Sequence, residues 1–218
     1  MMTNRSYLTG ALTGAVALLL SVSAFALPIT NGSMTGVPTI GAPPPGWASV
    51  SVDGDTISPG GFSGWGTGIG ASPDGGTFLA LLNNGGGGSF DAVQQIINGF
   101  VVGDTYTIAF SVANIGLDFI VDYANEGLIR ANIAGVDLDS ASLAHTGFGN
   151  QQWFGFSADF VATAASLTLT LSAERAASGG YAGGVDGVTI DAARQPIPEP
   201  SVLSLLAIGG LMLRRRKR

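Results

Sequence analysis

The side chains of this sequence that could bind a metal ion or transfer a proton are mainly carboxylates. The sequence has fifteen Asp and Glu residues, a single His and no Cys. Two Asp-x-Asp pairs stand at Asp53/Asp55 and Asp137/Asp139, and Asp186 lies in the stretch Gly-Gly-Val-Asp-Gly-Val. Carboxylate oxygens are hard ligands that suit Ca²⁺, yet neither pair is followed by the glycine and distal glutamate of an EF-hand loop. The sequence therefore offers calcium ligands without a calcium-loop motif.

Nucleophilic catalysis has little support in the residue types. His145 is the one histidine, so a Cys–His dyad is excluded, and no Gly-x-Ser-x-Gly elbow accompanies it for a serine triad. We expect His145 to be a solvated residue of the polar loop Ala-His-Thr-Gly-Phe-Gly-Asn. A carboxylate pair for glycoside hydrolysis stays open, although side-chain bonds to turn backbone account for acids such as Asp53, Asp55, Asp74 and Asp104. The sequence predicts that the protein is not an enzyme.

Three tryptophans offer flat faces on which the apolar C–H faces of sugar rings could stack: Trp47, Trp65 and Trp153. Trp65 lies in the loop Phe-Ser-Gly-Trp-Gly-Thr-Gly, where an aromatic has no evident core role, so it is the candidate stacking residue. Trp47 follows three prolines, and we expect it to pack where the domain begins. Trp153 precedes an alternating apolar pattern, which favours a core or strand-end position.

The segments that must position these residues alternate apolar and polar side chains with a period of two, which is typical of half-buried antiparallel strands. The apolar positions are Tyr106, Ile108, Phe110 and Val112; Ile129, Ala131 and Ile133; Phe154, Phe156, Ala158 and Phe160; and Leu167, Leu169 and Leu171. Residues 94–98 fit either a strand or a helix. Gly-rich turns separate the segments, and no stretch is convincingly helical. We predict an all-β fold, a single antiparallel β-sandwich (jelly roll) with eight or more strands over 27–192.

The charge of this central domain is strongly acidic. Between Leu27 and Ile197 the sequence has three cations, Arg130, Arg175 and Arg194, and all the acids except Glu199. Nucleic acid as a partner is therefore excluded, because it requires a basic face. The lack of Cys leaves no disulfide to stabilise the domain, so one large core must hold it together.

Residues 1–26 are predicted to be a signal peptide. Arg5 provides a short positive region, residues 11–20 are apolar, and Ala24-Phe25-Ala26 is a small-x-small site that signal peptidase accepts. The mature chain is expected to start at Leu27, outside the inner membrane.

The C-terminal residues 193–218 form a linker and a three-part tail. Pro198, Glu199 and Pro200 precede a short apolar segment, 201–213, and a basic end made of Arg214, Arg215, Arg216, Lys217 and Arg218. As a helix the apolar segment would be about 20 Å long, which is short for a hydrocarbon core of about 30 Å. The basic end is predicted to stay cytoplasmic, which leaves the domain outside.

This tail resembles a PEP-CTERM sorting signal, which is found on surface and matrix proteins of Gram-negative bacteria that make exopolysaccharide. The resemblance covers the last 22 residues or so. It implies that exosortase recognises Pro198, Glu199 and Pro200 and removes the tail, after a transient stage in which the inner membrane holds the protein. The scissile bond is not readable from the sequence.

The domain itself resembles a galactose-binding-like jelly roll. The stretches that carry this resemblance are I-T-N-G-S, P-P-P-G-W, G-D-T-Y-T-I-A-F-S-V, W-F-G-F-S-A-D-F-V-A-T-A-A-S-L-T-L-T-L and G-G-V-D-G-V-T-I-D. It implies a structural Ca²⁺ bound partly by Asp186; no other cofactor is expected. Met34 and Gly187 depart from the family pattern, where an aromatic residue and Asn are usual.

These observations together predict an exported protein of the cell surface or extracellular matrix, with a structural or adhesive role in an exopolysaccharide or biofilm matrix. The alternative functions are a carbohydrate-binding module and, with less support, a secreted hydrolase. The expected partners are signal peptidase, exosortase, the inner membrane and exopolysaccharide.

Overall fold

The structure is a computed structural model that describes residues 26–60, 70–84, 90–116, 123, 125–146, 151–175 and 179–193. Several predictions concern residues outside these ranges: the signal peptide up to residue 25, Trp65, and the linker and sorting tail from Arg194 to Arg218. They stay predictions. Over the described ranges, no helix is long and apolar enough to cross a membrane.

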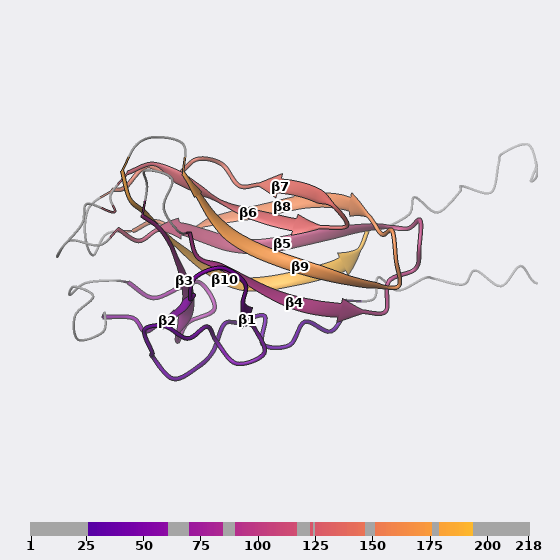
Figure 1. The fold of residues 1–218 in the computed structure, drawn as a ribbon, viewed down its shortest axis with the longest axis horizontal. Helices are drawn as coiled ribbons and strands as arrows, with labels where there is room; N and C mark the ends of the chain where they lie inside the picture. Colours follow the sequence, from indigo (N-terminus) through magenta and orange to yellow (C-terminus); the bar gives the residue numbers. More distant parts are fainter. Residues whose placement is uncertain are drawn as a thin grey trace, which may run out of the picture.

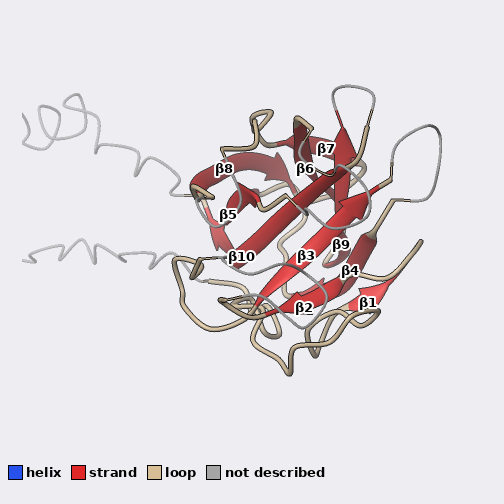
Figure 2. Ribbon diagram, turned by 90° about the vertical axis from the view of Figure 1, so that its left-hand side faces the viewer, coloured by secondary structure: helices blue, strands red, loops and turns tan. Residues whose placement is uncertain are grey.

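The described chain forms an all-β sandwich of two five-stranded sheets, and Figure 2 shows strands and loops with no helix. One sheet has the order β2-β3-β10-β5-β8 and the other the order β1-β4-β9-β6-β7, with antiparallel pairing between neighbouring strands. The strands are β1 (Ala48–Ser49), β2 (Asp55–Ile57), β3 (Phe78–Asn83), β4 (Ala92–Asn98), β5 (Thr105–Asn114), β6 (Gly127–Ile133), β7 (Val136–Asp139), β8 (Phe154–Val161), β9 (Ser166–Arg175) and β10 (Tyr181–Ala192). This arrangement confirms the predicted jelly-roll sandwich.

The alternating segments form strands where the sequence predicts them. In β5 the side chains of Tyr106, Ile108, Phe110 and Val112 are all buried, while the residues between them are more exposed. The ambiguous segment 94–98 belongs to β4, whose Val93 and Ile97 pair with the leucines of β9. Backbone pairing with β9 along the whole of β4, and with β1 at Val93 and Gln94, supplies hydrogen bonds that a helix would otherwise make locally.

The main core fills the space between the sheets, and a smaller one lies outside. Ile57, Phe78, Ile115 and the partly buried Trp153 form this second cluster with the other residues Ala80, Leu82, Ala113, Tyr123 and Ala182. Several of these residues belong to β3 and β10, on the face of their sheet that points away from the other sheet. The part of the outer face that lies over β3 and the start of β10 is therefore covered and is not free for a ligand.

The two strands at the open edge of the sandwich are β7 and β8, the last strands of their sheets. Strand β8 pairs only with β5, and β7 only with β6, among the described strands. Figure 1 shows these two edges on the same side of the molecule, and the loop 140–146 leaves β7 in this region. Both sheets thus contribute residues to a single opening between them.

Candidate ligand-binding site

A cleft of about 460 Å³ lies at this open edge; we call it the edge cleft. Strands β5 and β8 and the loop after β7 line it, through Val112, Ser140, Ala141, Ser142, Leu143, Ala144, Thr146, Phe154, Gly155 and Phe156. The lining combines aromatic and aliphatic groups with hydroxyl groups. A concave apolar site with a few polar groups is the usual form of a small-ligand site.

Phe154 is the exposed aromatic group of the edge cleft, with 47% of its surface accessible. Its backbone pairs with Val112, so its side chain lies on the same side of the sheet as the core residues but beyond the end of the packed core. The neighbouring inward residue, Phe156, packs on Phe110 with ring centroids 4.7 Å apart. Phe156 is thus held in place by the core, while one large ring, that of Phe154, stays available for contact.

The loop that forms the other wall is fixed by hydrogen bonds. The amide of Leu143 donates to the carbonyl of Gly127 (2.8 Å), and the amide of Ser140 donates to that of Ile129 (3.0 Å). Asn114 Nδ2 donates to the carbonyls of Leu143 (3.0 Å) and Asn125 (2.9 Å). A site held by such contacts loses little conformational entropy when it binds a ligand.

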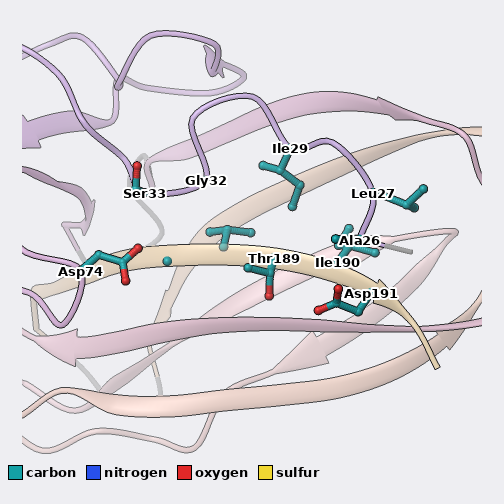
Figure 3. Close-up of a pocket in the computed structure, with 11 residues that line it drawn as sticks. Ala26, Leu27, Ile29, Gly32, Ser33, Asp74, Thr189, Ile190 and Asp191 are labelled. Carbon is teal, nitrogen blue, oxygen red and sulfur yellow. The ribbon is translucent and has the colours of Figure 1, made fainter. Parts of the chain in front are cut away.

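A smaller groove of about 260 Å³ lies between the N-terminal segment 26–33 and β10. Figure 3 shows Leu27 and Ile29 on this segment beside the strand, with Asp74 toward one end of the groove and Asp191 toward the other. The described lining has no aromatic side chain, so it offers no face for a sugar ring. Ala26, the last residue of the predicted signal peptide, pairs here with Asp191 in an isolated antiparallel bridge.

The described tryptophans have the structural positions expected of them. Trp47 is buried, and its Nε1 donates to the carbonyl of Asn31 at 3.2 Å, which confirms that it packs at the start of the domain. Trp153 is half-buried against Phe78, with ring centroids 5.3 Å apart. Neither presents a free face for a sugar. The sugar-stacking hypothesis for Trp65 concerns a residue outside the described ranges.

The second Asp-x-Asp pair lies on β7 and is explained by an ion pair. Arg130 Nε donates to Asp139 at 2.7 Å, and its Nη1 lies 3.6 Å from Asp137. This hydrogen bond to the guanidinium, helped by its charge, holds the pKa of Asp139 below its usual range. The Arg130 guanidinium thus offsets part of the negative charge of this pair and of the nearby Glu174.

The first Asp-x-Asp pair differs from the expectation of a turn, because Asp55 lies in β2 and is buried. The amide of Gly41 donates to Asp55 Oδ1 at 2.6 Å, so the predicted side-chain-to-backbone bond does exist. Burial and, to a lesser extent, the charge of Asp53 raise the pKa of Asp55 to about 6, against this hydrogen bond. Asp55 is thus a structural carboxyl group of the sheet.

Asp91 is a second buried carboxyl group, and sequence reasoning did not single it out. The amide of Leu82 donates to Asp91 Oδ2 at 2.8 Å. Burial and, to a lesser extent, the charges of Asp55 and Asp53 raise the pKa of Asp91 to about 7, against that hydrogen bond. Two carboxyl groups that are far apart in the sequence therefore interact in the fold and titrate near neutral pH.

Asp186 is fully buried in β10, where the amide of Gly187 donates to its Oδ1 at 2.8 Å. Its Oδ2 makes no hydrogen bond of good geometry, although the Ser72 hydroxyl and the amide of Asp74 lie close enough to stabilise the ionised carboxylate. Burial raises the pKa of Asp186, with a further contribution from the charge of Asp74. An unsatisfied buried oxygen is compatible with a Ca²⁺ ligand, but Ca²⁺ takes six to eight oxygens. No three Asp, Glu or His side chains gather into a metal-binding group within the described ranges, so calcium at Asp186 stays a prediction.

His145 lies in a loop, as expected, but its ring is half-buried against the backbone of Gly116 rather than solvated. Gly116 has a φ of +55° and no side chain, which leaves the space that the imidazole occupies. His145 does not line the edge cleft. The residues around His145 in the sequence do not indicate that its ring is half-buried, because Gly116, which makes room for the ring, is distant in the sequence.

The fold and the site define a jelly-roll sandwich with a cleft at one edge. No protein-family model matches the chain, and no curated protein matches it. Among solved structures, it is similar to the Stig cyclase Fisc of Fischerella sp. TAU in complex with a pyrrolidinylidene-indole, with 17% identity, a TM-score of 0.52, and coverage of 78% of this chain and 98% of that one.

Two further solved structures of lower similarity are carbohydrate-binding domains by description. A family 35 carbohydrate binding module of Clostridium thermocellum has 14% identity and a TM-score of 0.38, over 66% of this chain and 92% of that one. The C-terminal CBM6 of LamC, a marine laminarinase of Zobellia galactanivorans, has 18% identity and a TM-score of 0.39, over 66% and 98%. At such identities the similarity concerns the fold alone.

Proposed function

We propose that this is an exported bacterial surface or matrix protein whose β-sandwich binds polysaccharide at the edge cleft and thereby has an adhesive role in an exopolysaccharide matrix. The observation that carries the proposal is the exposed Phe154 ring in a preformed cleft with hydroxyl groups on its loop wall. A sugar ring has an apolar C–H face and a hydroxyl rim, which match these two kinds of lining group.

The lining favours binding rather than hydrolysis. The described side chains of the edge cleft are aliphatic, aromatic or hydroxyl groups, and none is a carboxyl group or an imidazole. Glycoside hydrolysis requires two carboxyl groups on opposite sides of the scissile bond, one of which donates a proton. The proposal is therefore that of a binding protein and not of an enzyme.

Replacing Phe154 by Ala is expected to weaken polysaccharide binding by at least about fivefold, since a buried aromatic contact contributes about 1–3 kcal/mol. Affinity electrophoresis of the mature protein in gels containing galactan, xylan, β-glucan or the producing cell's exopolysaccharide measures this loss. Phe90→Ala is the matched control, because Phe90 is also an exposed phenylalanine (39%) but does not line the cleft. No binding to any of these polysaccharides, or equal binding by the two variants, would overturn the proposal.

We also propose that the C-terminal tail is a sorting signal that exosortase removes. Its support is the order of Pro198-Glu199-Pro200, an apolar segment and five consecutive cations at the end of the chain. An extended proline-flanked glutamate just outside a membrane is accessible to a protease, because neither proline continues a helix.

Mass spectrometry of the surface-located protein is expected to show a C-terminus that lacks the basic end. Glu199→Ala is expected to leave uncleaved protein in the membrane fraction, because it removes the single charge of the recognition triad. Ser204→Ala, within the apolar segment, is the control and should be processed normally. An intact Arg218 on surface-located wild-type protein would contradict the sorting proposal.

A further inference from the structure

One end of the sandwich exposes an apolar surface made by two loops, 99–104 and 161–165; we call it the valine end. Val101, Val102 and Val161 are 58%, 61% and 51% exposed. The only ionisable side chain in these two loops is that of Asp104. Three neighbouring exposed valines form an apolar patch that the fold itself does not require, and such patches commonly mark interaction sites.

The two loops of the valine end are joined to each other by backbone hydrogen bonds. The amides of Gly99 (3.0 Å) and Phe100 (3.2 Å) donate to the carbonyl of Ala165, and the amide of Gly103 donates to that of Ala162 (2.8 Å). The amide of Val101 donates to the Tyr106 hydroxyl at 2.9 Å. The valines are therefore displayed on a fixed surface.

An aromatic cluster supports this surface from inside. Phe100 packs edge-on against Tyr106 (4.9 Å between centroids) and Phe160 (5.9 Å). All three rings are buried. Because the core beneath is already filled, Val101 and Val102 cannot turn inward without displacing these rings.

Both predicted membrane-directed segments join the domain at the valine end. The amide of Ala193, the last described residue before the tail, donates to the carbonyl of Thr105 at 2.9 Å, one residue after the loop 99–104. Ala26, at the predicted signal-peptide cleavage site, bridges to Asp191. Figure 1 shows that β4, β8 and β10, which lead into these loops or into the tail, end at the same end of the sandwich.

The linker between the domain and the apolar tail segment is short. Residues 194–200 separate Ala193 from Ser201, so even a fully extended linker spans at most about 28 Å. Strand β8 runs from the cleft end to the valine end and is about 24 Å long over its eight residues. A tail inserted in a membrane therefore keeps the valine end within about 28 Å of the bilayer. Contact between the valine end and the lipid would then place the edge cleft about a strand length farther away.

We propose that the valine end rests on the outer surface of the lipid bilayer while the tail still anchors the protein, and thereby orients the edge cleft away from the membrane. This inference rests on the proposed membrane insertion of the tail. Three valines cover too little area for stable binding alone, since even a whole acyl chain gives only reversible membrane binding. The contact is accordingly lost when the tail is removed, which frees the domain.

The lack of native Cys allows a direct test with single-cysteine variants of the protein from Leu27 to Arg218, which omits the apolar signal peptide so that flotation reports on the tail. The variants V102C and V37C, each labelled with an environment-sensitive fluorophore, are reconstituted through the tail into vesicles of phosphatidylethanolamine and phosphatidylglycerol. Val37 is 80% exposed and lies near β2, because Thr39 bridges to Thr56. Thr56 is at the cleft end of its sheet, since the paired residues Leu79, Val185 and Val112 connect it across the strands to Phe154. The probe at position 102 is expected to shift its emission to the blue and to be quenched by brominated lipids at least about twofold more than the probe at position 37.

The outcomes separate this inference from the one on which it rests. If the protein floats with the vesicles and both probes behave as in water, the valine end does not touch the lipid and the inference is wrong, while the anchoring holds. If the protein does not float, the tail does not insert and both proposals fail. A third variant, V102C with V101D and V161D, should float equally but lose the blue shift, which ties the signal to the apolar patch.

Discussion

Raising the pH from 4 to 8 is expected to lower the free energy of unfolding of this protein by several kcal/mol. The cause is the pair of buried carboxyl groups, Asp55 and Asp91, whose pKa values are raised from 3.8 to about 6 and about 7, first of all by burial. In the folded protein they hold their protons to higher pH than in the unfolded chain. Stability is therefore greatest below the unfolded pKa and is lost as the pH rises through the folded pKa values.

The size of the effect follows from the pKa values. The change from 3.8 to about 7 corresponds to about 4 kcal/mol for Asp91, and that from 3.8 to about 6 corresponds to about 3 kcal/mol for Asp55. The two are not additive, because ionisation of one carboxyl group disfavours ionisation of the other. The loss should be spread over pH 4 to 7 and be complete by pH 8, where both groups are ionised.

The variant Asp91→Asn tests this origin. An Asn amide oxygen can accept the hydrogen bond from the Leu82 amide but carries no charge at any pH. We expect Asp91→Asn to match the wild type at pH 4 and to be more stable by about 4 kcal/mol at pH 8. Urea unfolding at several pH values measures both, because the midpoint and slope give the free energy of unfolding.

Asp104→Asn is the matched control, since Asp104 is an exposed carboxylate of a surface loop. It should leave the pH profile of stability as it is in the wild type. A wild-type stability that is constant from pH 4 to 8, or an Asp91→Asn profile that runs parallel to it, would show that these carboxyl groups do not control the fold.

The strands were predictable because their signal is local. The alternation of Ile108, Phe110 and Val112 with smaller or polar residues identifies β5 and its buried face without any knowledge of its partners. Residues 94–98 show the limit of such reasoning. Their pattern fits both periods, and it is the pairing of Ile97 with Leu167 that makes the segment a strand.

The edge cleft could not be predicted, because its residues meet only through tertiary pairing. Phe154 appears in the sequence as one more member of an alternating strand. It becomes exposed because β8 is the last strand of its sheet and because the loop 140–146 leaves an opening beside it. In the same way, Asp55 and Asp91 are ordinary acids in the sequence, and their pKa values rise only because β3 and its neighbours enclose them. Strand order and burial depend on contacts between distant parts of the chain, so the periodicity of a single segment does not predict them.

Replacing Gly127 by Ala is expected to destabilise the fold by about 3 kcal/mol, which is at the upper end of the usual range for overpacking. A Cβ at this position of β6 would lie 2.3 Å from Cγ of the Tyr181 ring and 2.6 Å from both Cδ atoms. Carbon atoms that are not bonded to each other normally remain about 3.5–4.0 Å apart. The added methyl group therefore needs the ring to move by more than an ångström.

The Tyr181 ring has no room for such a movement. It is fully buried, and a Cβ at Gly183 of the same strand would also lie 2.8 Å from its hydroxyl oxygen. Two glycines, one from each sheet, thus form the space that holds this ring between the sheets. Since β6 and β10 lie in different sheets, the clash can be relieved only by separating the sheets or by rotating the ring out of the core.

The control for this prediction is Gly155→Ala, because Gly155 is also a strand glycine but a Cβ there would meet no atom within 4 Å. It should change the free energy of unfolding by less than about 1 kcal/mol. The double variant Gly127→Ala/Tyr181→Leu should be more stable than the sum of the two single changes predicts, since the smaller side chain gives the methyl group its space. If Gly127→Ala unfolds at the same urea concentration as Gly155→Ala, the ring and the strand do not pack as described. If the effects of Gly127→Ala and Tyr181→Leu on the free energy of unfolding simply added, this packing would also be contradicted. Contact between residues 127 and 181 is what should make the two effects non-additive.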